Sequence, residues 1–422
     1  MVSLEEGRAL AEDLDARDAL GPLRDSFLFP RGPEGAPVVY LTGNSLGLQP
    51  RTARARVEEV LEDWAGRGVE GHLEGDSPWL PYHRFLTAPT ARLVGAQPDE
   101  VVVMNTLTVN LHLLMVSFYR PTAGRHRIVY EGSAFPSDRY AFASQVRFHG
   151  FDPAEALVPL SPRPGEDLLR PEDLLDAIAR EGERLALVLI GDVNYLTGQA
   201  FDVSAITRAG HAVGATVGFD LAHGAGNLVF QLHDDGPDFA AWCSYKYLNG
   251  GPGALGGAFV HARHREAQGL PRFEGWWGHD EARRFEMGPR FQGMAGAEGW
   301  QLSNPPILSL AALRASMDLF DAVGMTALRR KSERLTGLMD QLVRGMPGVE
   351  VITPAEPAQR GAQLSLRIHR DPRGLVQRLT AAGVVCDFRA PDIVRAAPAP
   401  FYTRFGDVVR FAEVLRSHVQ GR

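Results

Sequence analysis

The middle of the chain alternates short apolar runs with stretches of helical character, and this alternation constrains the fold more than any other feature. The runs that begin near residue 100 are apolar throughout. Strands of this kind are buried on both faces, which is typical of a parallel sheet wrapped by helices. The predicted strands are EVVVMN, HRIVYEG, LALVLIGDVNY, ATVGFDLAH, DFAAWCSYKYL and GGAFVHA, and the predicted helices between them include VNLHLLMVSFY, PEDLLDAIAREGE and VSAITRAGHAVGA.

A change of pattern near residue 309 predicts a second, smaller α+β domain. One long helix is expected over residues 309–346, followed by the strands VEVITP and AQLSLRIH and the helices PRGLVQRLTAAG and DVVRFAEVLRSHV. A length of 422 residues also exceeds that of most single domains. We therefore predict an α/β fold with a large domain over residues 56–308, a small C-terminal domain over 309–422, and an N-terminal segment, 1–55, that joins the small domain.

Composition restricts the class of protein. A hydrophobic content of 45% and a charged content of 23% are ordinary for a soluble chain, and no apolar run reaches the roughly 18 residues that span a bilayer. The net charge of −7 argues against a nucleic-acid surface. The N-terminus lacks a secretory signal, and two cysteines cannot build a disulfide framework or a structural zinc site. We expect a cytoplasmic protein without a metal.

The chain contains two lysines, Lys246 and Lys331, and carries its other positive side chains as arginine. A lysine amine can lose its proton and attack a carbonyl carbon, whereas a guanidinium stays charged. Lys246 ends a predicted strand and precedes glycines that let a ligand approach the backbone. The alternative is a lysine that extends from a strand end into solvent. Lys331 lies in the charged run LRRKSERL and is predicted to be solvated.

Asp220 ends the preceding strand, and His223 follows it. A buried carboxylate needs a cationic partner, and a protonated pyridine nitrogen is one. The alternative is a helix N-cap. An aspartate and a lysine at the ends of successive strands are the arrangement that pyridoxal phosphate (PLP) enzymes use.

Two further segments fit such a cofactor. Thr106 and Thr108 open a predicted helix whose free N–H groups can hold a phosphate, although ordinary threonine capping explains them equally well. After another strand, Phe135 offers a ring to stack on the cofactor and Asp138 a polar neighbour. Taken alone, Phe135 also fits the hydrophobic core.

Across nearly its whole length the sequence resembles the kynureninase family of fold type I PLP enzymes. The matching stretches, in order, are GNSLGLQP (43–50), GHLEGDSPW (71–79), MNTLTVNLHLLM (104–115), FPSD (135–138), YLTGQAFD (195–202), VGFDLAHGAGN (217–227), WCSYKYLNGGPG (242–253), GWWGH (275–279), LSNPPIL (302–308) and VRAAPAPFY (394–402). The resemblance implies PLP-dependent hydrolysis of the Cβ–Cγ bond of kynurenine to anthranilate and alanine.

The resemblance also implies residue roles. Lys246 is expected to bond to the cofactor aldehyde and to move the Cα proton, with Tyr245 as a phosphate contact and general acid. Asp220 is expected to pair with the pyridine nitrogen, and Arg395 to hold the substrate carboxylate. The remaining implied cofactor contacts are Leu107, Thr108, Phe135, Pro136, Ser137, Asp138, His223, Trp276 and Asn304.

The resemblance carries two further expectations, one about partners and one about substrate. Trp276 and Asn304 resemble residues contributed across the interface of a two-fold homodimer with shared active sites. His72 and Asn304 resemble the pair near the aromatic ring in members that prefer 3-hydroxykynurenine, so appreciable activity on that substrate is expected. Trp276 as core, Asn304 as a turn residue and Arg395 as a surface charge are the simpler alternatives.

Two rival functions have distinct requirements. A cysteine desulfurase-like enzyme needs a mobile thiol over the cofactor, whereas Cys243 is expected to point away from Lys246 and Cys386 lies in the small domain. A PLP-binding protein without activity would be indicated by loss of Lys246, Asp220 or Arg395, and all three are present.

Overall fold

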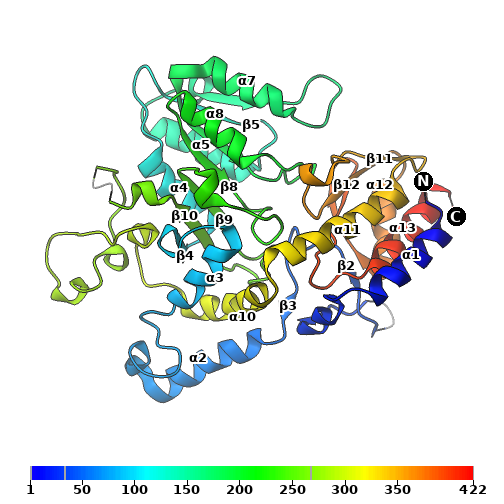
Figure 1. Ribbon diagram of the computed structural model, residues 1–422, viewed down its shortest axis with the longest axis horizontal. Helices are drawn as coiled ribbons and strands as arrows, with labels where there is room; N and C mark the ends of the chain where they lie inside the picture. Colours follow the sequence, from blue (N-terminus) through cyan, green and yellow to red (C-terminus); the bar gives the residue numbers. More distant parts are fainter. Residues whose placement is uncertain (1, 33–34, 267–268, 422) are drawn as a thin grey trace.

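The fold is taken from a computed structural model that describes residues 2–32, 35–266 and 269–421. Its larger sheet has seven strands in the order β4-β10-β9-β8-β7-β5-β6. Figure 1 labels β4, β5, β8, β9 and β10 of this sheet, with helices around them. Strand β10 is antiparallel to β4 and β9, and the other neighbours pair in parallel. The predicted mostly parallel α/β sheet is thus confirmed. The strands are β4 (Val101–Met104), β5 (Arg127–Glu131), β6 (Leu157–Leu160), β7 (Leu185–Gly191), β8 (Thr216–Asp220), β9 (Phe239–Cys243) and β10 (Gly256–Val260).

Helices cover both faces of this sheet, as strands that are apolar throughout require. Strand β4 shows the alternation, because Val102 and Met104 join one hydrophobic cluster and Val101 and Val103 join another. The first cluster includes side chains from α4 (Leu107–Phe118) and α5 (Pro136–Phe148). The second includes side chains from α3 (Arg84–Val94), α7 (Pro171–Glu181) and α8 (Val203–Ala212).

A second sheet has four antiparallel strands in the order β11-β12-β15-β14. It comprises β11 (Val349–Val351), β12 (Leu364–Ile368), β14 (Asp387–Arg389) and β15 (Ile393–Ala396), and it lies near α12 (Pro372–Ala381) and α13 (Phe405–Val419). The N-terminal helix α1 (Leu4–Ala16) packs on α13, so the two termini lie close together (Figure 1). Strand β2 (Val39–Tyr40) also pairs with β13 (Val384–Val385).

The remaining elements are short or peripheral. Helix α2 (Ala53–Arg67) packs on α10 (Ile307–Val323), and the short elements are β1 (Phe27–Leu28), β3 (Gln49–Pro50), α6 (Pro153–Ala156) and α9 (Leu232–Asp235). In the part of the chain that the structure describes, no helix combines the length and apolar character needed to cross a membrane.

The single helix predicted over residues 309–346 is wrong. The structure has two helices, α10 (Ile307–Val323) and α11 (Met325–Val343). Gly324 separates them with φ +79°, a left-handed value that favours glycine, and its N–H bonds to the carbonyl of Phe320 at 2.8 Å. The apolar periodicity continues across this break, which is why the pattern alone predicts one helix.

The prediction that Lys331 is solvated is also wrong. Its side chain is 5% exposed, and its Nζ lies 2.7 Å from Oδ2 of Asp18, which is 6% exposed. Asp18 belongs to the N-terminal segment, which covers this part of α11. The charged run therefore includes a buried ion pair that fastens the N-terminal segment to α11.

Replacing Lys331 with methionine is expected to lower the free energy of unfolding by about 3–5 kcal/mol, because it leaves the Asp18 carboxylate buried without its cation. Equilibrium denaturation of the Lys331→Met variant measures this loss. Arg330→Met is the matched control, since the neighbouring Arg330 is exposed and its replacement should cost less than about 0.5 kcal/mol. Equal effects of the two changes would contradict a stabilising role for the ion pair.

Candidate active site

A cavity of about 280 Å³ lies at the carboxyl ends of the parallel strands, where open α/β sheets place their ligands. The ends of β5, β7 and β8, the segment after β9, and the first turns of α4 and α5 form its walls. The structure brings together these predicted residues in the lining: Leu107, Thr108, Phe135, Ser137, Asp138, Asp220, His223, Tyr245 and Lys246.

Lys246 lies in the turn that follows β9, and its side chain contributes to the cavity wall rather than extending along the outer surface. The N-terminal GNSLGLQP motif packs against this turn, where the N–H of Gly47 donates to the carbonyl of Tyr245 at 2.9 Å. A Cβ on Gly47 would lie 2.4 Å from the carbonyl oxygen of Lys246, so only glycine fits this approach. The motif therefore supports the backbone of the lysine.

Two buried carboxyl groups, Asp138 and Asp220, pair beside the cavity. Burial, followed by the Asp220 charge, raises the pKa of Asp138 well above its ordinary value. Burial also raises the pKa of Asp220, but a hydrogen bond from Asp138 and the Lys246 charge oppose that rise. We infer that Asp138 holds the proton and Asp220 the charge. Oδ1 of Asp220 accepts the Ala222 N–H at 2.8 Å, and a turn rather than a helix follows, so the helix N-cap alternative fails.

The same region holds two more buried acids. Both carboxyl oxygens of Asp192 lack a hydrogen-bond partner among the described residues, and burial followed by the Asp220 charge raises its pKa well above the ordinary value. Burial raises the pKa of Glu131, which lines the cavity, to about 7. The buried carboxyl groups therefore outnumber the one lysine in this region. Such a site suits a ligand whose protonated ring nitrogen lies beside Asp220.

Groups that favour a bound anion, in contrast to these acids, lie where α4 and α5 begin. Residues from the first turns of both helices line the cavity, and Oγ1 of Thr108 and Oγ of Ser137 hydrogen-bond at 2.8 Å to join the two ends. Thr106 is the N-cap of α4 but makes no side-chain capping bond, so ordinary capping does not explain it. Two helix N-termini that meet in one cavity are suited to a phosphate.

Aromatic and imidazole groups complete the wall. Phe135 is 50% exposed, which excludes the core alternative, and its ring contacts that of Tyr195 edge-on with centroids 5.4 Å apart. Pro136, a predicted cofactor contact, is the first residue of α5 and is not part of the described cavity lining. Burial, followed by the Lys246 charge, lowers the pKa of His223 well below its ordinary value, so its imidazole is neutral. Burial also raises the pKa of the Tyr245 hydroxyl, which stays protonated.

Arg395 is not part of the cavity wall, but it contacts a residue that is. Its Nη1 donates to the carbonyl of Tyr195 at 2.5 Å, and its Nη2 pairs with the carboxylate of Asp387. The side chain is 1% exposed, so the surface-charge alternative is wrong. Its Nε is buried and has no hydrogen-bond partner among the described residues.

Three predicted residues lie away from the cavity of their own chain. Trp276 is 39% exposed and donates from Nε1 to the carbonyl of Arg284 at 3.0 Å. Asn304 is exposed, and the ring of His72 lies edge-on to Trp79 with centroids 5.2 Å apart. A single chain thus leaves these side chains unconnected to the cavity, and the core alternative for Trp276 does not hold.

Neither cysteine contributes to the described cavity wall. Burial raises the pKa of Cys243, and it raises the pKa of Cys386 to about 12. Both thiols therefore stay protonated near neutral pH and are poor nucleophiles.

Sequence reasoning missed Glu131, Asn194 and Tyr195, which also line the cavity. Glu131 ends an apolar strand just as Asp220 does, so the signal that identified Asp220 was present for it too. Asn194 and Tyr195 follow β7 in a turn whose course depends on contacts distant in the sequence.

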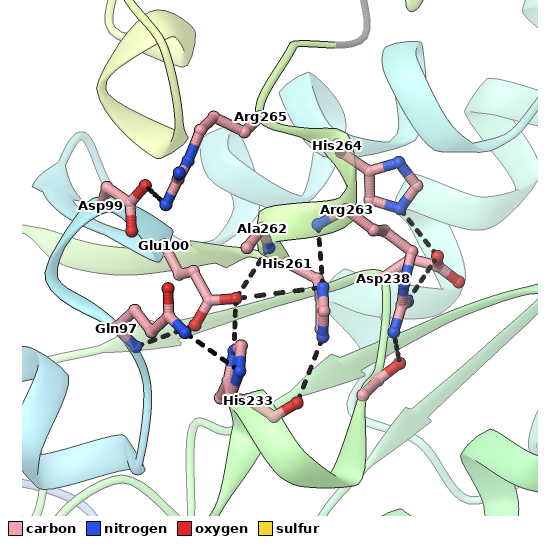
Figure 2. A network of polar contacts seen from close by, with 11 residues as sticks. Gln97, Asp99, Glu100, His233, Asp238, His261, Ala262, Arg263, His264 and Arg265 are labelled. Carbon is pink, nitrogen blue, oxygen red and sulfur yellow. Dashed lines mark hydrogen bonds and ion pairs between the residues drawn. The ribbon is translucent and has the colours of Figure 1, made fainter.

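A separate polar network lies at the other end of β10 (Figure 2). Ligand atoms of Glu100, His233 and His261 lie within 4.8 Å of one another, a spacing that a metal ion requires. However, Oε1 of Glu100 accepts the Ala262 N–H at 2.7 Å and pairs with Nδ1 of His233 at 2.9 Å. Nδ1 of His261 accepts the Arg263 N–H at 3.0 Å. Because protein donors already engage these atoms, we assign a hydrogen-bonded network to this site.

Asp238, which Figure 2 also shows, has hydrogen-bond partners on both carboxylate oxygens. Its Oδ1 pairs with His264 at 2.8 Å and with Arg263 at 3.1 Å, and its Oδ2 pairs with His211 at 2.9 Å. Burial alone would raise the pKa of Asp238, but the hydrogen bonds from His211 and His264 outweigh it and hold the pKa below the ordinary value.

A depressed folded-state pKa contributes stability above the unfolded value of about 3.9, and this contribution is lost as the pH falls through the folded pKa. Asp238→Asn is therefore expected to cost about 3 kcal/mol at pH 7 and to reduce the decline in stability below pH 4. Unfolding free energies between pH 3 and 7 measure both effects. A variant that keeps the parent's full acid decline would contradict the assignment.

The sheet, the lysine in the turn after β9 and the paired acids together define a fold type I PLP-dependent enzyme. Solved structures with this fold include a cysteine desulfurase from Thermococcus onnurineus NA1, with a TM-score of 0.75, 16% identity, and coverage of 97% of this chain and 98% of that one. Another is a C-DES variant with glycine covalently linked to its PLP cofactor, with a TM-score of 0.76, 15% identity, and coverage of 92% and 99%. At such identities the likeness shows the fold alone.

Sequence comparison defines the family. Residues 328–415 match the Kynureninase C-terminal domain family. The chain is 64% identical over 418 residues to the kynureninase of Myxococcus xanthus, covering 99% of this chain and 98% of the relative. It is 58% identical to that of Koribacter versatilis, with 96% of each chain covered, and 59% identical to that of Salinispora tropica, with 90% of each covered. The chain belongs to the kynureninase family, as the resemblance in its motifs predicted.

Proposed function

We propose that this enzyme hydrolyses the Cβ–Cγ bond of L-kynurenine to give anthranilate and L-alanine, with PLP as its cofactor. The observation that carries the proposal is one cavity that joins Lys246, the Asp138–Asp220 pair and two helix N-termini. Identity of 64% over nearly the whole length of a curated kynureninase supports the same activity.

The donor set fits PLP at both ends. The N–H groups at Leu107 and Thr108 and the hydroxyl of Ser137 would hold the phosphate. Asp220, kept charged by its protonated neighbour Asp138, would hold the ring nitrogen, while Phe135 and His223 would flank the ring. When bound, PLP supplies an electron sink for bonds at the substrate Cα.

The chain's own residues then have distinct tasks. The amine of Lys246 would hold the cofactor at its aldehyde and would move the proton at the substrate Cα. Arg395 holds the substrate carboxylate with its remaining donors. Tyr245, whose hydroxyl stays protonated, donates a proton at the γ-carbonyl, where water adds before the carbon–carbon bond breaks.

Purified protein with PLP and L-kynurenine tests the proposal directly. Equimolar anthranilate and L-alanine are expected by chromatography, and unchanged kynurenine would refute the activity. The same preparation tests the desulfurase alternative, because persulfide formed from L-cysteine would indicate that chemistry instead. The raised pKa values of both thiols disfavour it.

A homodimer with shared active sites is part of the proposal. Trp276 and the side chains of Phe285 and Met287 near it are 39%, 61% and 70% exposed, an apolar surface that a second copy would cover. Trp276 and Asn304 would then reach the partner's cavity. We further propose a cytoplasmic enzyme without a membrane, nucleic-acid or metal partner, built from a large domain over residues 56–308 and a small domain over 309–422 that the segment 1–55 joins.

The last part of the proposed function concerns the range of substrates. His72 and Asn304 can both hydrogen-bond a ring hydroxyl, so we propose appreciable turnover of 3-hydroxy-L-kynurenine. Comparing kcat/KM for the two substrates tests this, and failure to turn over the hydroxylated one would exclude it.

A further inference from the structure

Glu131 is a buried acid at the cavity for which the proposed reaction has no task. It ends β5, is 4% exposed, and lines the cavity. Its Oε1 accepts hydrogen bonds from Oγ of Ser133 at 2.9 Å and from Nδ2 of Asn194. Neither donor is charged, so the site keeps a carboxyl group at a desolvation cost. Buried acids of this kind, with a pKa raised by burial to about 7, cluster at functional sites.

Asn194 hydrogen-bonds both to Glu131 and to the turn after β7, and so links their positions. While its Nδ2 donates to Glu131, its Oδ1 accepts the N–H groups of Leu196 at 2.8 Å and Thr197 at 2.7 Å. The side chain thus connects the end of β5 to the backbone of the turn. This pair of bonds fixes the direction of the carbonyl of Tyr195, which lies between Asn194 and Leu196.

The Tyr195 carbonyl connects the turn after β7 to Arg395. It accepts hydrogen bonds from Nη1 of Arg395 at 2.5 Å and from Nε2 of Gln363 at 3.1 Å. On the other side, Nη2 of Arg395 pairs with Asp387. With both Nη atoms engaged in these contacts, the guanidinium has one orientation, and its Nε is the buried donor without a partner among the described residues.

We propose that Glu131 is a positioning residue for the substrate carboxylate. It holds Asn194, Asn194 holds the Tyr195 carbonyl, and that carbonyl orients Arg395 so that its Nε edge faces an incoming carboxylate. The inference rests on the proposed function, because it takes Arg395 as the carboxylate-binding residue. It identifies Glu131 and Asn194 as determinants of selectivity for amino acids over simple amines.

Ligands that differ only in the carboxylate separate positioning from general support of the cavity. L-Alanine, the amino-acid product, and ethylamine, the same molecule without its carboxylate, both react with the cofactor aldehyde. Their dissociation constants follow from the change in cofactor absorbance of the holoenzyme, without turnover. For Glu131→Leu, the dissociation constant of L-alanine is expected to rise about tenfold, or about 1.4 kcal/mol, while that of ethylamine stays within about twofold.

Two conservative changes test the bond itself. Asn194→Asp keeps the oxygen that accepts the two turn N–H groups but removes the donor to Glu131, so it is expected to weaken L-alanine binding selectively. The double variant Glu131→Gln/Asn194→Asp exchanges donor and acceptor and is expected to restore binding to within about threefold of the parent. Because these variants nearly keep the size and shape of the side chains, they still test the proposal if Glu131→Leu does not fold.

Equal losses for L-alanine and ethylamine would overturn the proposal, because they would show that Glu131 only supports the cavity. No loss for L-alanine, or no recovery in the double variant, would overturn it as well. The test is separate from that of the proposed function. A parent enzyme that prefers L-alanine to ethylamine yet leaves L-kynurenine uncleaved would refute the activity alone.

Discussion

Lys246→Ala is expected to lower kcat/KM for L-kynurenine by at least about a thousandfold, because no other lysine lines the described cavity. The variant removes the side chain that we propose both bonds to the cofactor aldehyde and moves the Cα proton. The loss should appear in kcat as well as in kcat/KM, since the proton is moved in the transition state. Steady-state kinetics with saturating PLP measure it.

Lys246→Arg is the matched variant. It keeps a positive charge near Asp220 but cannot supply an unprotonated amine, so it should be about as inactive as Lys246→Ala. The absorbance of the cofactor bonded to the lysine should be missing from both. An arginine variant with near-parent activity would show that the side chain contributes charge rather than covalent chemistry.

Asp220→Asn is expected to reduce kcat by about a hundredfold or more. Asparagine keeps the shape of the side chain but removes the negative charge that stabilises a protonated ring nitrogen, and such fixed charges act strongly in a buried site. Of the two buried carboxyl groups, Asp138 and Asp220, we assign Asp220 as the ionised one. Kinetics at saturating PLP and substrate measure the loss.

Asp138→Asn is the control for that prediction. Since we assign the proton to Asp138, an amide in its place still donates a hydrogen bond to Asp220, and the expected loss is less than about tenfold. Equal losses in the two asparagine variants would contradict the division of proton and charge between these carboxyl groups.

The larger sheet could be predicted because its signal is local. Strands that are apolar on both faces, separated by helices, have few arrangements other than a parallel sheet covered on each side. The cavity could be anticipated for a related reason, since Asp220 ends β8 and Lys246 follows closely after β9, and the carboxyl ends of these parallel strands meet at one edge.

The errors come from contacts that the local pattern does not contain. LRRKSERL has the composition of a solvated helix face, yet the N-terminal segment covers it and pairs Asp18 with Lys331. Gly324 interrupts a continuous apolar periodicity by adopting a positive φ. Strand β15, which carries Arg395, was not predicted because its four residues are too short a run to stand out.

Other features need the assembled chain or a second copy. Arg395 donates a hydrogen bond to the carbonyl of Tyr195, which lies 200 residues earlier in the chain. No local sequence pattern predicts a contact over that separation. Trp276, Asn304 and His72 have recognisable motifs but lie away from the cavity of their own chain, so their roles remain predictions about the dimer.

The central claim is that Lys246 bonds to the PLP aldehyde, and the chain offers a sharp test because it contains only one other lysine. Borohydride reduction of the holoenzyme makes the carbon–nitrogen bond permanent, and peptide mapping by mass spectrometry then locates the pyridoxyl group. The account predicts the label on the peptide containing Lys246 and none on the peptide containing Lys331. A label on Lys331 or on the N-terminal amine, with Lys246 unmodified, would contradict it.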